Sequence, residues 1–216
     1  PWATAPFMLL KAPEEAEYLT LFGDAGRQLT PEANAVFGGQ YRIAGHDVTF
    51  EPAAQADGLF AAKGEVITAN WVEAEQLFGC LRQFNGELSL QPGLVHRANG
   101  GVLIISLRTL LSQPLLWMRL KTIVHQQRFD WVGYDESRPL PVSVPSMPLS
   151  LTVVLTGDRE SLADFQEMEP ELAELAVYSE YEDNIQVADA DDMAQWCQWV
   201  LAVAERFALP MPAADA

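Results

Sequence analysis

The chain has 216 residues, of which 49% are hydrophobic, and it contains six tryptophans and ten phenylalanines. This length suits one α/β domain, alone or with an appendage, and the aromatic content is typical of a packed core rather than of a disordered segment. The formal net charge of −17 argues against nucleic-acid and anionic-membrane partners, because proteins bind phosphate-rich surfaces through lysine and arginine.

The two cysteines, Cys80 and Cys197, are too few for a disulfide framework and lack the spacing of metal ligands. We expect no signal peptide and no membrane helix, since no apolar run approaches the roughly 20 residues that such a helix needs. These features favour a reducing compartment, and we expect a cytoplasmic protein. Because the first residue is not methionine, we also expect the chain to be a piece of a longer one.

Phe7–Leu10 is a short apolar run that predicts a strand, and apolar residues at helical spacing predict a helix over Glu14–Arg27. The segment Lys11–Glu17, which follows the strand and includes the start of the helix, has the sequence KAPEEAE. A phosphate-binding loop has the pattern G-x-x-x-x-G-K-[ST], in which glycines let the backbone approach the phosphates and the lysine neutralises them. This segment has no glycine and three glutamates, so a helix start stabilised by acidic side chains is favoured instead.

Gly38–Glu51 predicts a β-hairpin with its turn at Gly45–His46. The Ala- and Gly-rich stretch Pro52–Lys63 is expected to be a loop, and Glu65–Thr68 another strand. Together, residues 38–68 are expected to form a β insertion.

Trp71–Gly86 (WVEAEQLFGCLRQFNG) carries apolar residues at helical spacing, which favours one helix face packed in the core. Gly86–Leu90 alternates as a short strand and leads to Pro92. The residues assigned to the helix face are Leu77, Phe78, Leu81 and Phe84.

Pro92–Leu111 (PGLVHRANGGVLIISLRTLL) contains the most strongly apolar strand of the sequence, Val102–Ile105. A continuous apolar run after a Gly-Gly turn indicates a strand buried on both faces of a parallel sheet. Ser106 then stands at the carboxyl end of this strand, where open α/β sheets bind their ligands.

Ser106–Gln127 predicts two helices divided at Pro114, because proline fits the first turn of a helix but not its interior. Phe129–Gly133 predicts a strand. Arg138–Pro148 holds four prolines and is expected to be an extended connector or a hairpin arm.

Leu149–Leu155 predicts a second buried strand, followed by Thr156 and Asp158. Asp158 is expected to cap a helix over Glu160–Glu167. Three further elements are predicted toward the C-terminus: a strand at Tyr178–Val187, an amphipathic helix at Asp189–Phe207, and a frayed end at Pro210–Ala216.

Three of these stretches resemble the AAA+ module of Lon-like (LonB-related) proteases: Glu75–Gly79 (E-x-L-F-G), Gly93–Ile105 (G-x-x-H-R-A-N-G-G-V-L-I-I) and Glu169–Ala176 (E-P-E-L-A-E-L-A). The resemblance implies an α/β fold, with a three-layer core like that of AAA+ and other P-loop NTPases. Its sheet is mostly parallel with a small β-hairpin insertion. The core is expected at 1–188, and the helix at 189–209 is expected to begin a lid subdomain.

The resemblance also implies that the nucleotide site is degenerate. Where active relatives have a Walker B Asp-Glu pair, this chain has Ser106 and Leu107, and from 160 to 205 it has no arginine or lysine to act as an arginine finger. We therefore expect no catalytic residue, no metal, and no bound ATP or Mg²⁺ in this chain. The remnant of the nucleotide pocket comprises Pro13, Glu14, Ser106, Thr156 and Asp158.

Two pairs of residues have other expected roles by the same resemblance. Phe78 and Gly79 are candidates for contact with polypeptide in a central pore, the alternative being that Phe78 belongs to the core. His96 and Arg97 are candidates for a subunit interface, the alternative being a helix-end histidine and a surface arginine.

The function implied is that of a degenerate AAA+-like module in an ATP-dependent serine protease. It would support a homo-oligomer and handle unfolded polypeptide for a Ser/Lys peptidase domain elsewhere in the longer protein, since no G-D-S-A motif occurs here. Two alternatives stay open: a protein-binding scaffold with no proteolytic role, and a working ATPase with divergent motifs.

Overall fold

The computed structural model describes residues 5–13, 16–29, 35–53, 57–133 and 139–181, and also 193–194, 197–198 and 201. By its internal contacts the chain divides into two units, Pro1–Tyr181 and Glu182–Ala216. In the second unit the few described residues are helical and fall within the helix predicted at Asp189–Phe207. The rest of that helix and the predicted frayed end lie outside the described residues.

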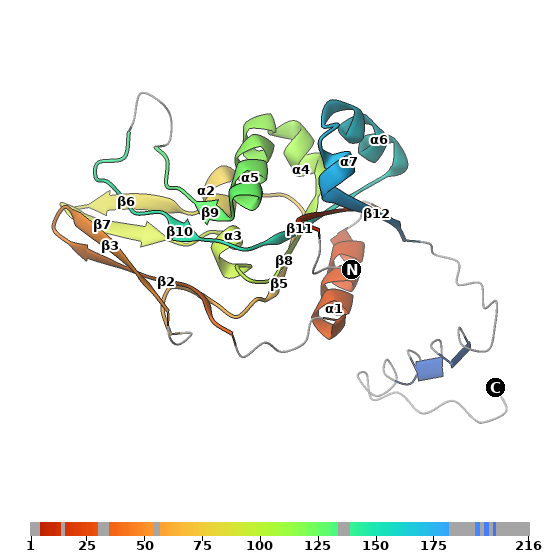
Figure 1. Ribbon diagram of the computed structural model, residues 1–216, viewed down its shortest axis with the longest axis horizontal. Coiled ribbons are helices and arrows are strands. Elements are labelled where there is room, and N and C mark those ends of the chain that lie inside the picture. Colours follow the sequence, from red (N-terminus) through yellow and green to blue (C-terminus); the bar gives the residue numbers. More distant parts are fainter. Residues whose placement is uncertain are drawn as a thin grey trace. The chain divides into compact units, whose positions relative to one another are not determined.

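A five-stranded parallel sheet in the order β12-β1-β11-β8-β5 forms the centre of the first unit (Figure 1). The two strands predicted to be buried, β8 and β11, lie side by side within it. The predicted α/β class with a mostly parallel sheet is confirmed. The strands are β1 (Phe7–Lys11), β5 (Val66–Ala69), β8 (Val102–Ser106), β11 (Thr152–Gly157) and β12 (Ala176–Glu180).

Helices cover both faces of this sheet and make three layers. Successive residues of a strand point to opposite faces, so Leu103 and Ile105 enter one apolar core while Ile104 enters another. The first core is closed by α4, α5 and α6, and the second by Leu19 and Phe22 of α1. The bounds are α1 (Ala16–Leu29), α4 (Leu107–Ser112), α5 (Pro114–Gln126), α6 (Arg159–Met168) and α7 (Leu172–Leu175).

Two local signals that placed helix boundaries are confirmed. Pro114 is the first residue of α5 and separates it from α4. The Asp158 carboxylate accepts a hydrogen bond from the Ser161 backbone N–H at 2.7 Å, which is the geometry of a helix N-cap.

A small antiparallel sheet in the order β3-β2-β4 is inserted between α1 and β5. Its first hairpin turns at Gly45–His46, as predicted. The expectation of a loop over Pro52–Lys63 is wrong in part, because β4 lies within it and is held by pairing with β2. In addition, β5 falls inside the expected insertion 38–68 but pairs with β8 in the main sheet. The bounds are β2 (Phe37–Ala44), β3 (Asp47–Pro52) and β4 (Phe60–Ala62).

The single helix face predicted over Trp71–Gly86 is wrong. Helix α2 (Ala74–Phe78) ends at Gly79, whose φ of +73° is unfavourable for other residues. The chain then forms an antiparallel hairpin of β6 (Cys80–Phe84) and β7 (Glu87–Gln91). Its turn is Asn85–Gly86, with φ of 49° and 84° at the two positions, the conformation that an Asn-Gly hairpin turn requires.

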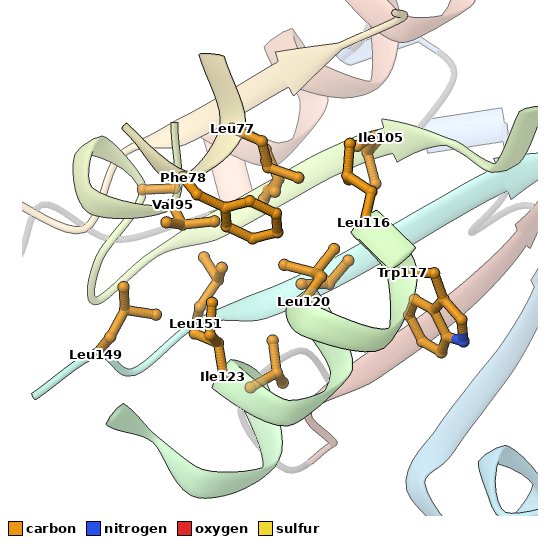
Figure 2. Packing of buried hydrophobic residues seen from close by; sticks show 14 of the residues in the cluster. Leu77, Phe78, Val95, Ile105, Leu116, Trp117, Leu120, Ile123, Leu149 and Leu151 are labelled. Atoms are coloured by element: carbon orange, nitrogen blue, oxygen red, sulfur yellow. The ribbon is translucent and has the colours of Figure 1, made fainter. Parts of the chain in front are cut away.

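The remaining elements join the insertion to the main core. The short helix α3 (Leu94–Arg97) precedes β8, and β9 (Arg128–Phe129) pairs with β10 (Met147–Pro148). The strand predicted at Phe129–Gly133 is therefore shorter and starts one residue earlier. Likewise β12 begins before the strand predicted at Tyr178–Val187. Figure 2 shows side chains of α2, α3 and α5 meeting in the core between these elements.

Candidate functional site

The carboxyl edge of the parallel sheet brings the sequence-predicted pocket residues together. Thr156 and Ser106 are register partners on neighbouring strands, and both are buried. On the other side of β11, Lys11 is the register partner of Gly157. After β1 the chain forms β5, β8 and β11 on one side of it, and then β12 on the other side. The carboxyl ends of β1 and β11 are therefore the topological switch point, where such sheets bind ligands.

The segment after β1 is tied to its neighbours by backbone hydrogen bonds. The Ala12 N–H donates to the Gly157 carbonyl at 3.0 Å, and the Tyr181 N–H donates to the Lys11 carbonyl at 2.8 Å. Pro13 follows directly, and Glu14 lies outside the described residues. Glu17 is in the first turn of α1, where its charge complements the helix dipole.

One carboxylate holds two cations at this edge. Glu180 accepts from the Lys11 ammonium at 3.3 Å and from the Arg159 guanidinium at 3.4 Å. The Tyr178 hydroxyl also donates to it, at 2.9 Å, and these hydrogen bonds, first that of Tyr178 and then that of Lys11, hold the pKa of Glu180 below its usual value. We call these four side chains the Glu180 cluster.

The residues at the end of β8 and β11 do not fit Mg²⁺ and a triphosphate. Ser106 offers only a hydroxyl where a carboxylate would hold the metal, and Leu107 is fully buried in the core and cannot accept a proton. Asp158 has an oxygen engaged in capping α6. Lys11 and Arg159 are already paired with Glu180, so a phosphate group would have to compete with that carboxylate for both of them.

Phe78 lies where the core alternative places it. The Phe78 ring is 1% exposed and the Arg119 guanidinium lies 4.3 Å above its centroid. Gly79 is pressed against the backbone, since a Cβ there would come within 2.1 Å of the Gln91 carbonyl oxygen. The aromatic side chain that does reach solvent is Phe84, 77% exposed beside the β6–β7 turn. The Asn85–Gly86 signal in the sequence would have found it.

His96 and Arg97 separate in the structure. Arg97 is exposed, whereas His96 is 1% exposed and stacks on Trp131 with ring centroids 5.4 Å apart. The His96 Nδ1 accepts a hydrogen bond from the Gly93 N–H at 2.9 Å, so the ring proton belongs on Nε2, which has no partner among the described residues. Burial, and secondarily the charge of Arg119, lower the pKa of His96 to about 3.

The free energy of unfolding should therefore depend on His96 protonation. The folded state keeps His96 neutral down to about pH 3, whereas the unfolded chain takes up a proton near 6.5. Protonation of His96 therefore takes nothing from the free energy of unfolding above pH 6.5. Between pH 6.5 and 3 it lowers the free energy of unfolding by about 1.4 kcal/mol per pH unit. Urea unfolding at several pH values should show a steeper loss for the wild type than for His96→Gln. Equal losses in the two proteins would assign the acid sensitivity to other groups.

Two hollows lie away from this edge. One of about 220 Å³ is lined by β2, β3 and the loop after β3, and one of about 400 Å³ lies near the amino ends of β8 and β11.

Within the described ranges, no three His, Cys, Asp or Glu side chains gather as a metal site would require. No helix in the described part of the chain has the length and apolar character to cross a bilayer.

Comparison with known proteins gives results of three kinds. Residues 63–179 match the family model described as LonB-like, AAA domain. Two relatives, each named "Putative Lon protease homolog", come from Escherichia coli (strain K12) and Haemophilus influenzae; they are 64% identical over 214 residues and 38% identical over 210 residues. The alignments cover 99% and 94% of this chain but 36% and 35% of the relatives, so the chain spans about a third of their length.

A solved structure is similar in fold. It is a chain from the complex between subunits BchI and BchD of magnesium chelatase, with a TM-score of 0.50 and 18% identity. The match covers 92% of this chain and 63% of that one. At this identity the likeness concerns the arrangement of the elements and not the chemistry of the site.

Proposed function

Because the chain belongs to the LonB-like AAA domain family, we propose that it is an AAA+-like module that no longer binds nucleotide. Its role is to assemble an oligomer and to present unfolded polypeptide to a peptidase domain. That domain, with a Ser/Lys active site, lies outside this chain, in the longer protein that the length of the relatives suggests. We place the protein in the cytoplasm, which the two free cysteines support.

The observation that carries the loss of nucleotide binding is the Glu180 cluster. A phosphate group would have to displace the Glu180 carboxylate before it could pair with either Lys11 or Arg159. At the end of β8 the carboxylate pair that would hold Mg²⁺ is replaced, because Ser106 ends this strand and Leu107 begins α4. Phosphoryl transfer depends on such positioned charges, and they are missing here together.

Titration with a fluorescent ATP analogue and Mg²⁺ tests this directly. We expect no saturable binding up to millimolar nucleotide and no change in the unfolding midpoint. A nucleotide present at about 100 times its Kd would add about 2.7 kcal/mol to the free energy of unfolding, which is easily detected. Micromolar binding, with or without hydrolysis, would favour the divergent ATPase instead.

The β6–β7 hairpin supports the polypeptide-handling part of the proposal. Its turn lies at the end of the first unit that is remote from the helical layers (Figure 1), and Phe84 beside that turn is exposed. An exposed aromatic ring on a turn can stack on or wedge against side chains of an extended polypeptide. Phe84 therefore takes over the role that the sequence suggested for Phe78.

A further inference from the structure

One long part of the sequence lacks acidic residues. Between Glu87 and Asp130 there is no aspartate or glutamate, although the chain as a whole has 30 of them. Helices α4 and α5 lie in this interval and form part of the surface of the first unit. A surface built from these two helices therefore has no carboxylate of its own.

The outer side of α5 is also apolar. Leu115 and Met118 are neighbours at i and i+3 and are 81% and 57% exposed, while Trp117 and Leu120 on the opposite side are buried. Thr122 continues the outer side by one turn. On α4, Arg108 is exposed and forms no ion pair with any described residue. We call Arg108, Leu115, Met118 and Thr122 the α5 face.

A second surface has the opposite charge. On α6, Glu160, Asp164 and Glu167 follow one another at i, i+4 and i+7 and are exposed, with Met168 62% exposed at the end of the helix. Like charges at this spacing repel each other along a helix. Glu171 and Glu174 extend the surface along α7, and none of the five carboxylates forms an ion pair within the described chain. We call this surface the acidic ridge.

We propose that the α5 face of one copy of this chain binds the acidic ridge of a second copy. Acidic residues outnumber basic ones by 30 to 13 in the chain, whereas α4 and α5 supply Arg108 and no carboxylate to the α5 face, so an acidic ridge meets little like charge there. Leu115 and Met118 supply apolar contact area that Met168 can cover. The contact joins two different surfaces of one molecule, which makes it the repeated joint of an assembly.

The inference rests on the oligomer-forming part of the proposed function but not on the loss of nucleotide binding. Sedimentation velocity of the 216-residue chain should show association that strengthens with protein concentration and weakens as salt is raised. Leu115→Asp should raise the dissociation constant about 30-fold or more. Leu59→Asp is the matched control, since Leu59 is 61% exposed in the insertion, and it should leave the association unchanged.

Mixing two variants identifies the paired surfaces. Leu115→Asp disables the α5 face, and Asp164→Lys combined with Glu167→Lys disables the acidic ridge, so each variant alone should be monomeric. Mixed together, they should form a one-to-one complex through their remaining intact surfaces. Circular dichroism and urea unfolding confirm that both variants are folded.

A monomeric wild type overturns the inference, as does association that survives both variants or variants that fail to recombine. Those outcomes leave the nucleotide titration untouched, so failure of this inference is distinguishable from binding of nucleotide at the sheet edge. Capture of an unrelated acidic protein by the α5 face, with the wild type monomeric, would likewise contradict the choice of a second copy as the occupant.

Discussion

Replacing Phe78 with alanine is expected to lower the free energy of unfolding by about 3–5 kcal/mol. The ring is 1% exposed and belongs to the main core, and Figure 2 shows it lying close to Val95. Truncation leaves a cavity there and removes the ring beneath the Arg119 guanidinium. Domains of this size have a total stability of about 5–15 kcal/mol, so the loss should be plain in urea unfolding followed by tryptophan fluorescence.

Phe84→Ala is the matched control for the same side chain in a different place. Phe84 is 77% exposed, so its removal should change the free energy of unfolding by no more than about 0.5 kcal/mol. It should instead weaken binding of a fluorescently labelled, permanently unfolded polypeptide, measured by anisotropy. If Phe78→Ala left stability unchanged and weakened polypeptide binding, Phe78 would be the contact residue and not part of the core.

Gly101→Ala is expected to cost about 3 kcal/mol, at the upper end for an overpacked site. A Cβ on Gly101 would come within 2.2 Å of the Glu65 carbonyl oxygen and 2.4 Å of the Gly64 carbonyl carbon. These are backbone atoms, so no rotation of a side chain can relieve the clash. The two residues before β5, Gly64 and Glu65, would have to move away from β8. This movement would break the hydrogen bond from the Val102 N–H to the Glu65 carbonyl.

Gly157→Ala serves as the control for Gly101→Ala, because a Cβ on Gly157 meets its nearest neighbour, the Leu107 Cβ, at an ordinary 3.4 Å. Both substitutions add one methyl group beside a strand of the main sheet. Thermal and urea unfolding should separate them clearly. Equal stability of the two variants would mean that Gly64 and Glu65 can move away from position 101 at little cost in free energy.

The parts of the fold that were predictable have strong local signals. Val102–Ile105 is an apolar run after a Gly-Gly turn, Pro114 can only begin a helix, and Asp158 can cap one. The hairpin region after α2 carried two competing signals. Its apolar residues fit a helical spacing, but Asn85–Gly86 favours a hairpin turn, and the turn prevails.

The parts of the candidate site that depend only on the order of the strands could be predicted. The parts that depend on packing between distant segments of the chain could not. Ser106 and Thr156 meet because two buried parallel strands end at one edge. The pairing of Lys11 with Glu180 joins positions 169 residues apart, and no local pattern encodes it. The burial of His96 likewise depends on Trp131 from a later segment, so its spacing in the sequence resembles that of a helix-end surface residue.

The position of β1 in the sheet has a consequence for biosynthesis. Its neighbours on both sides, β11 and β12, lie more than half the chain later in the sequence, as the register of Phe7 with Val153 and Ala176 shows. On the ribosome, β1 must therefore wait with its apolar side chains uncovered until almost the whole first unit has emerged. Such long-range closure slows folding and leaves a nascent chain open to aggregation until β11 and β12 have been made.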